Sequence, residues 1–221
     1  MFKLFHKKDN QLQQDVMDEL QWDPRVTSGD ITVTAKDGVV TLKGSVPHFF
    51  ERFNAEDAAQ RVSGVHGIAD ELEVKVPEDY ARSDEEIAKA ALDALKWNYS
   101  APKGVTVTVD KGWVTLNGDA EWDFERNSAK TAVSSLWGVR GVSNDIKLKS
   151  RVLPSDVKKL IEGALKRSAE SEAQNISVSV SGSQVNLSGT VHSFAEMEDA
   201  RTAAWSAPGV MSVQDDLKIA A

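Results

Sequence analysis

The stretch GVVTLKGSV, residues 38–46, decides the fold because the chain repeats it twice. GWVTLNGDA begins at Gly112, and SQVNLSGTV begins at Ser183. In all three copies a second glycine follows the phrase at the same distance, as in a tandem repeat. The paired glycines that define the repeat are Gly44 and Gly64, Gly118 and Gly138, and Gly189 and Gly209. We expect these glycines to serve turns and close packing, since no phosphate-loop pattern GxxxxGK[ST] surrounds them.

Each copy carries the same order of hydrophobic periods. A helical stripe comes first, which in the first copy is Leu12, Val16 and Leu20. Two segments with alternating apolar residues follow, and the repeated phrase forms the second of them. A second helical stripe, rich in alanine, and a last alternating segment complete the copy. This order predicts α-β-β-α-β in every copy.

The turns and connections between these segments predict how the strands pair. Short turns with glycine join the first two strands, which indicates an antiparallel hairpin. The second and third strands flank a helix, so a right-handed crossover is expected to make them parallel. We therefore predict an α+β protein of three tandem units, residues 1–76, 77–150 and 151–221. Each unit should hold a three-stranded mixed sheet with two helices on one face, and the short connectors should keep the units in contact.

The composition argues against several kinds of partner. The 221 residues include 34 acidic and 26 basic residues, for a net charge of -8, and no cysteine. Binding to a phosphate backbone needs clustered lysine and arginine, so nucleic acid is not an expected partner. Without cysteine, neither disulfides nor thiolate chemistry is available.

The beginning of the sequence bears on location. In MFKLFHKKDNQLQQ a lysine interrupts the apolar residues, so the continuous apolar core of a signal peptide is missing. No other stretch approaches the ~20 apolar residues of a membrane span. We expect a cytoplasmic protein, with peripheral attachment to the membrane as the alternative.

Neither a metal site nor a catalytic site is predicted. The four histidines form no HxxxH or HExxH pair, so no metal or cofactor is expected. A glutamate recurs near the start of each second helix, at Glu51, Glu125 and Glu196, where the helix dipole accounts for it. Tandem copies rarely each preserve one catalytic site, and we expect a non-enzymatic protein.

The three units resemble the BON domain. The resemblance rests on GVVTLKG with VHGIADELEV, on GWVTLNG with VRGVSNDIKL and, less closely, on SQVNLSG with PGVMSVQDDLKI, where the preceding glycine is displaced to Gly182. It implies a binding or scaffold module of osmotic-stress and envelope-associated proteins, proposed to contact phospholipid. One cytoplasmic branch of the family couples such a domain to potassium binding. Many members carry a secretion signal or a lipid anchor, and this sequence departs from that pattern.

Asp70, Asn144 and Asp215 occupy the same place in the three units. Each lies two residues before an inward Leu or Ile, so strand alternation points the side chain toward the helices. A polar group in that position must be hydrogen-bonded, and a bond to a nearby backbone N–H is the first explanation. The alternative is an oxygen-lined cation site, because hard cations prefer carboxylate and carbonyl oxygen. Potassium is the cation that this alternative would hold.

Six tryptophans offer candidate contact residues. Trp22 and Trp97 both fall two residues after the last leucine of a first helix, outside its buried stripe and near a loop. Trp113 alternates away from the inward residues of its strand. Packing between units is one role for these rings, and contact with a lipid interface or a partner is the other.

The leading hypothesis is a non-enzymatic, stress-associated protein of three BON-like units that binds a phospholipid surface or an envelope protein. A potassium-responsive ion-binding module is the first alternative. A self-assembling scaffold, in which the chain binds copies of itself, is the second.

Overall fold

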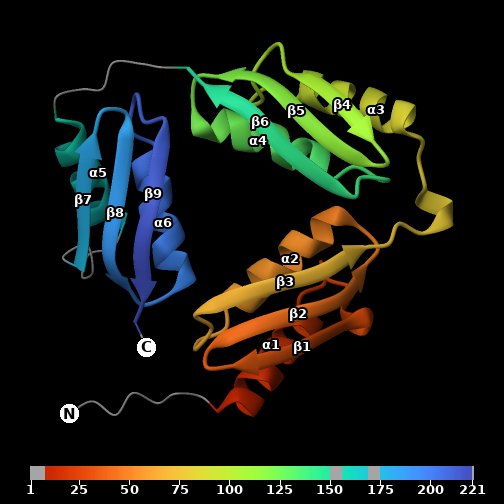
Figure 1. The fold of residues 1–221 in the computed structure, drawn as a ribbon, viewed down its shortest axis with the longest axis horizontal. Coiled ribbons are helices and arrows are strands. Elements are labelled where there is room, and N and C mark those ends of the chain that lie inside the picture. Colours follow the sequence, from red (N-terminus) through yellow and green to blue (C-terminus); the bar gives the residue numbers. More distant parts are fainter. Residues whose placement is uncertain (1–7, 150–155, 169–174, 221) are drawn as a thin grey trace.

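The structure is a computed structural model, and it describes residues 8–149, 156–168 and 175–220. Three units follow one another along the chain, each with its own three-stranded sheet (Figure 1). The first unit contains α1 (Asp9–Trp22), β1 (Ile31–Lys36), β2 (Val39–Val46), α2 (Phe49–Gln60) and β3 (Gly67–Val74), with the short 3-10 helix η1 (Ser28–Asp30) before β1.

The second and third units repeat this order. The second unit contains α3 (Asp84–Trp97), β4 (Thr106–Asp110), β5 (Trp113–Ala120), α4 (Asp123–Ser134) and β6 (Gly141–Leu148), and the 3-10 helix η2 (Glu78–Tyr80) precedes it. The third contains α5 (Val157–Ser168), β7 (Ile176–Ser181), β8 (Gln184–Val191), α6 (Phe194–Trp205) and β9 (Ser212–Ile219). The predicted α-β-β-α-β order and the α+β class are confirmed in all three units.

The strand of the repeated phrase lies in the middle of each sheet. In the first unit β2 pairs antiparallel with β1 and parallel with β3. Val40 and Leu42 of β2 are fully buried against the helices, together with Leu12, Val16 and Leu20 of α1. The same pairings recur in the other two sheets. The mixed sheet, with two helices on one face, is therefore confirmed as well.

The last glycine of the repeated phrase is required by a close approach of two backbones. Gly44 has φ +132°, and a Cβ on it would lie 1.9 Å from the carbonyl oxygen of Asp30, just before β1. Gly189 is in the same situation, with φ +131° and the carbonyl oxygen of Asn175 at 2.0 Å. Gly118 of the second unit is looser, because its nearest atom is the Cα of Val105 at 3.3 Å.

Each unit contacts the other two through aromatic side chains. Phe49, the first residue of α2, is buried in the core of the second unit. Phe194, the first residue of α6, packs against the core of the first unit, and Trp205 at the end of α6 packs against that of the second. The second helices α2, α4 and α6 accordingly lie toward the middle of the arrangement (Figure 1). The expectation that the units touch is confirmed.

The close approach at Gly44 predicts how alanine will be tolerated there. Gly44→Ala is expected to lower the free energy of unfolding by more than about 2 kcal/mol, because Cβ meets a backbone atom and the positive φ is strained. Urea denaturation followed by circular dichroism measures this. Gly118→Ala is the matched control, with a smaller loss expected. Equal losses in the two variants would show that the collision with Asp30 is not the cause.

Candidate functional site

Two tryptophans at equivalent positions are the most exposed large apolar side chains at the ends of helices. Trp22 ends α1 and Trp97 ends α3, and each is 83% exposed. In the second unit Tyr99 is 99% exposed, and Leu92, on α3, is also exposed. We call Leu92, Lys96, Trp97, Tyr99 and Lys103 the α3 surface. Trp22 and Trp97 are residues that the sequence predicted as contacts, whereas Leu92 and Tyr99 were not predicted.

The α3 surface borders a shallow cavity and carries positive charge. The cavity has a volume of about 390 Å³ and is lined by Leu92, Lys96, Tyr99 and Lys103, among others. Lys96 and Lys103 are both exposed. The combination of apolar rings with lysine is typical of surfaces that meet the headgroup region of a membrane.

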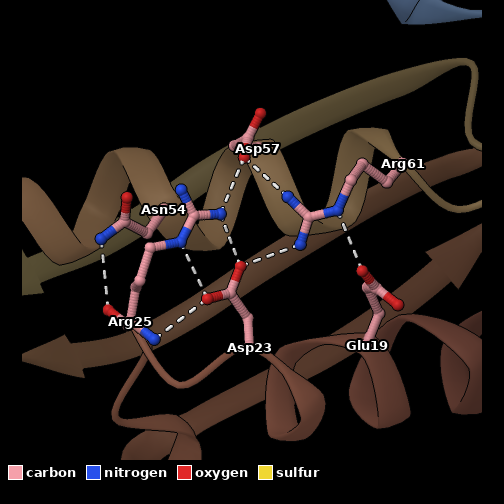
Figure 2. Close-up of polar contacts among 6 residues, drawn as sticks. All are labelled: Glu19, Asp23, Arg25, Asn54, Asp57 and Arg61. Carbon is pink, nitrogen blue, oxygen red and sulfur yellow. Dashed lines mark hydrogen bonds and ion pairs between the residues drawn. The ribbon is translucent and has the colours of Figure 1, made fainter.

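The end of α1, which presents Trp22, is held by a buried carboxylate. Asp23 is 5% exposed, and its carboxylate accepts three hydrogen bonds from Arg25, at 3.0 Å from the backbone N and at 2.9 and 2.7 Å from Nε and Nη2. Arg61 adds a fourth, from Nη2 at 2.8 Å. These contacts, led by the side chain of Arg25, hold the pKa of Asp23 far below the usual carboxyl range. Figure 2 shows the carboxylate between the two guanidinium groups.

The same cluster ties α1 to α2. Arg61, just beyond α2, donates from Nη1 to Asp57 at 2.7 Å and from Nε to Glu19 of α1 at 3.0 Å (Figure 2). Asn54 of α2 donates to the carbonyl oxygen of Arg25 at 3.2 Å. The carboxylates raise the pKa of both arginines, chiefly through the bond that each makes to Asp23. The cluster therefore fixes the position of the helix end that carries Trp22.

In the second unit the position of Asp23 is taken by an amide side chain, which also fixes the end of the first helix. Asn98, which follows Trp97, donates from Nδ2 to the hydroxyl of Ser128 on α4 at 3.0 Å. Its Oδ1 accepts from the backbone N of Ser100 at 3.0 Å, which sets the direction of the chain through Tyr99. Two residues after the last buried leucine of α5, the third unit has Arg167 instead of tryptophan. The exposed ring is thus a feature of the first two units.

Trp113, the third predicted contact residue, lies differently. It is half-exposed on the side of the sheet away from the helices, and its Nε1 donates to the hydroxyl of Ser143 at 2.9 Å. Its ring covers Gly141, where an added Cβ would lie 2.4 Å from the ring. Part of its apolar surface is therefore already used within the sheet.

The three cation-site candidates lie in three different sheets and are not brought together. Asp70 forms an ion pair with Arg52 of α2 and accepts from the backbone N of Leu72. Asp215 accepts from the backbone N of Leu217 at 3.0 Å. Asn144 donates to the carbonyl oxygen of Arg126 at 2.8 Å, and its buried Oδ1 has no hydrogen-bond partner. Among the described residues no group of three or more His, Asp or Glu side chains could hold a metal ion.

The recurring glutamates all accept backbone N–H groups. Glu51 accepts from Thr27 at 2.8 Å, Glu125 accepts from Trp122 at 3.1 Å, and Glu196 accepts from His192 at 2.7 Å. Each lies in the first turn of its helix, where a carboxylate is favoured by the helix dipole. Their shared position has a structural explanation.

The repeat and its central strand match one family model. The BON domain model matches residues 8–76, 83–150 and 155–221. This chain belongs to the BON domain family. It is 27% identical over 129 residues to the osmotically-inducible protein Y of Escherichia coli strain K12, in an alignment that covers 56% of this chain. The chain spans 64% of the length of that relative.

Two solved structures of CdsD, a structural protein of the type III secretion system of Chlamydia trachomatis, also align with this BON protein. The first has a TM-score of 0.27 and 16% identity, over 94% of this chain and 91% of that one. The second, of the C-terminal domain, has a TM-score of 0.27 and 15% identity, over 97% and 100%. Similarity at this level carries no argument about function. Within the part of the chain that the structure describes, no helix is long and apolar enough to cross a membrane.

The cluster around Asp23 predicts a pH-dependent contribution to stability. Asp23→Asn is expected to lower the free energy of unfolding at pH 7 by about 2–3 kcal/mol, because it removes a charged acceptor and leaves the arginines underpaired. The native carboxyl has a lowered pKa, so its contribution is complete above about pH 5 and is lost as the pH falls below about 4. Denaturant titrations of both proteins from pH 7 to pH 2 should show the difference shrinking.

Asp57→Asn is the matched control for this prediction, since Asp57 binds the same two arginines from an exposed position. We expect it to cost less than about 1 kcal/mol. A loss for Asp23→Asn that does not change with pH would contradict the electrostatic explanation.

Proposed function

We propose that this BON protein binds a phospholipid membrane surface through Trp22 and the α3 surface, without catalysis. The observation that supports the proposal is the exposure of two tryptophans at the same place in two units, 83% in each. Transfer of a water-exposed tryptophan ring into the interfacial region of a membrane is favourable, because the ring leaves water while its N–H stays hydrated. Contact with an envelope protein through the same rings is the alternative partner.

Local charge favours the lipid surface although the whole protein is acidic. The net charge of -8 repels anionic lipid at long range. Lys96 directly precedes Trp97, and Lys96 and Lys103 line the same cavity as Tyr99. Each lysine near an anionic surface contributes about 1 kcal/mol. We therefore propose that ring insertion supplies most of the affinity and that the lysines orient the α3 surface toward the membrane.

The proposed setting is osmotic stress. Support comes from the relative in Escherichia coli, whose name describes it as osmotically inducible. A peripheral attachment by exposed rings suits a chain in which no described helix could cross a membrane. A cytoplasmic location, with peripheral binding to the membrane, is part of the proposal.

We also propose that the protein is not an enzyme. The carboxylates that recur in all units accept backbone N–H groups at helix starts, and Asp23 is enclosed by two arginines. Their structural roles explain why these carboxylates are present, and proton transfer is not needed to account for them. No contact among the residues that the structure describes favours the potassium hypothesis or the scaffold hypothesis, and both serve as outcomes of the experiment below.

The lipid proposal predicts loss of binding when the exposed rings are removed. In co-sedimentation with vesicles of phosphatidylcholine and phosphatidylglycerol, Trp97→Ala is expected to bind about tenfold more weakly than the unmodified protein. The reason is that losing one inserted ring removes about 1.5 kcal/mol of apolar transfer. Trp22→Ala combined with Trp97→Ala should abolish sedimentation.

Trp113→Ala is the control, because its ring is partly used within the sheet and should contribute little to binding. Unchanged binding of the double variant would overturn the proposal. Melting temperatures in potassium and sodium chloride at equal ionic strength test the first alternative, since selective binding of potassium would stabilise the protein. A molecular mass that rises with protein concentration would support the scaffold.

A further inference from the structure

Two of the contacts between units are built from equivalent residues. Phe49 begins α2 and enters the second core, and Phe194 begins α6 and packs against the first core. Each follows the N-cap residue of its helix, His48 or Ser193. In Figure 1 the start of α6 lies near the end of the first unit where β2 and β3 begin. We call these contacts joint 1–2 and joint 3–1.

Joint 1–2 holds a cluster of three rings. The ring of Trp137 lies parallel to that of Tyr80, with centroids 4.1 Å apart and an interplanar angle of 16°. The imidazole of His48 meets Trp137 edge-on, at 4.6 Å and 77°. Trp137 directly precedes Gly138, the second glycine of its repeat. The indole thus lies between His48, at the start of α2, and Tyr80, and 44% of its surface remains exposed.

Joint 3–1 has small residues where joint 1–2 has these rings. Ser63 directly precedes Gly64 and so takes the place of Trp137, and Ser193 takes the place of His48. A cavity of about 740 Å³ lies here, and both serines line it. Its volume is within the range of pockets that enclose small molecules, about 300–1,000 Å³.

The lining of this cavity indicates the chemistry of its ligand. Leu12, Val62, Phe194 and Ile219 supply apolar surface, and His66 and His192 supply imidazole rings from two different units. Lys8 and Arg61 are matched by Asp9 and Asp37, so neither sign of charge dominates. A flat, uncharged ring system suits apolar walls and imidazoles better than an ion does.

We propose that the cavity of joint 3–1 binds a small, uncharged planar aromatic compound, whose ring occupies the space that Trp137 fills in joint 1–2. Such a ligand contacts the first and third units at once and strengthens the joint between them. None of Trp22, Trp97 and Tyr99 lines the cavity. The proposal is therefore independent of membrane binding and goes beyond it.

Titration of 5-fluoroindole, followed by fluorine NMR on the full chain, tests this proposal. The unmodified protein should shift the fluorine resonance in a saturable way. Ser63→Trp is expected to fill the cavity as Trp137 fills joint 1–2, and to weaken binding at least tenfold while keeping the melting temperature. Ser63→Leu, which places a smaller apolar side chain in the cavity, should also weaken binding. This variant tests the proposal if tryptophan at this position prevents folding.

Two controls separate the cavity from other aromatic surfaces. Ser63→Ala keeps the cavity open and should bind as the unmodified protein does. Trp22→Ala combined with Trp97→Ala should also bind unchanged, whatever its behaviour with vesicles. The proposal is overturned if the unmodified protein shows no saturable shift, if folded Ser63→Trp and Ser63→Leu bind normally, or if the double tryptophan variant loses binding.

Discussion

The close passage of two backbones at the end of the central strand is the constraint on which the first and third units depend. Asp30, the residue before β1, lies so close to Gly44 of β2 that no Cβ could be accommodated beside its carbonyl oxygen. This passage sets the start of β1, and with it the antiparallel register that buries Val33 against the helices. Helix packing over the sheet follows from that register, because a shift by one residue would turn the apolar side chains outward. In the first and third units a steric demand of the fold therefore explains the last glycine of the repeated phrase, and a ligand is not needed to explain it.

Small units make the joints between them energetically important. A unit of roughly 70 residues buries a modest core, so apolar area gained between units adds a large fraction to its stability. The structure uses helix starts for this purpose, since Phe49 and Phe194 leave their own units and join the cores of neighbours. The first helices of the first two units end in exposed side chains, Trp22 and Trp97. The second helices therefore hold the units together, whereas the first helices carry the rings proposed to bind the membrane.

Periodicity could predict the elements and their pairing, because both depend on residues close in the sequence. Alternation around Val40 and Leu42 defined the central strand, and the leucine spacing around Leu20 defined the helix beside it. The exposure of Trp22 and Trp97 followed from their position outside that stripe. The joints could not be predicted in this way, since the contact of His48 with Trp137 depends on how two folded units meet. The same holds for the cavity at Ser63, which is visible only when the third unit lies against the first.

Divergence among the copies changes the partners of an arginine that two units share. Arg52 and Arg126 occupy equivalent positions of α2 and α4, and Arg52 pairs with Asp70 inside the first unit. In the second unit Asp70 is replaced by Asn144, which is uncharged and cannot hold a guanidinium group in an ion pair. Arg126 pairs instead with Asp123, and its guanidinium carbon lies 5.1 Å from the ring centroid of Trp205 in the third unit. A cation over an indole ring contributes about 0.5–2 kcal/mol. With an amide in place of the carboxylate and Asp123 in place of Phe49, the arginine of the second unit takes a new ion-pair partner and contacts the third unit.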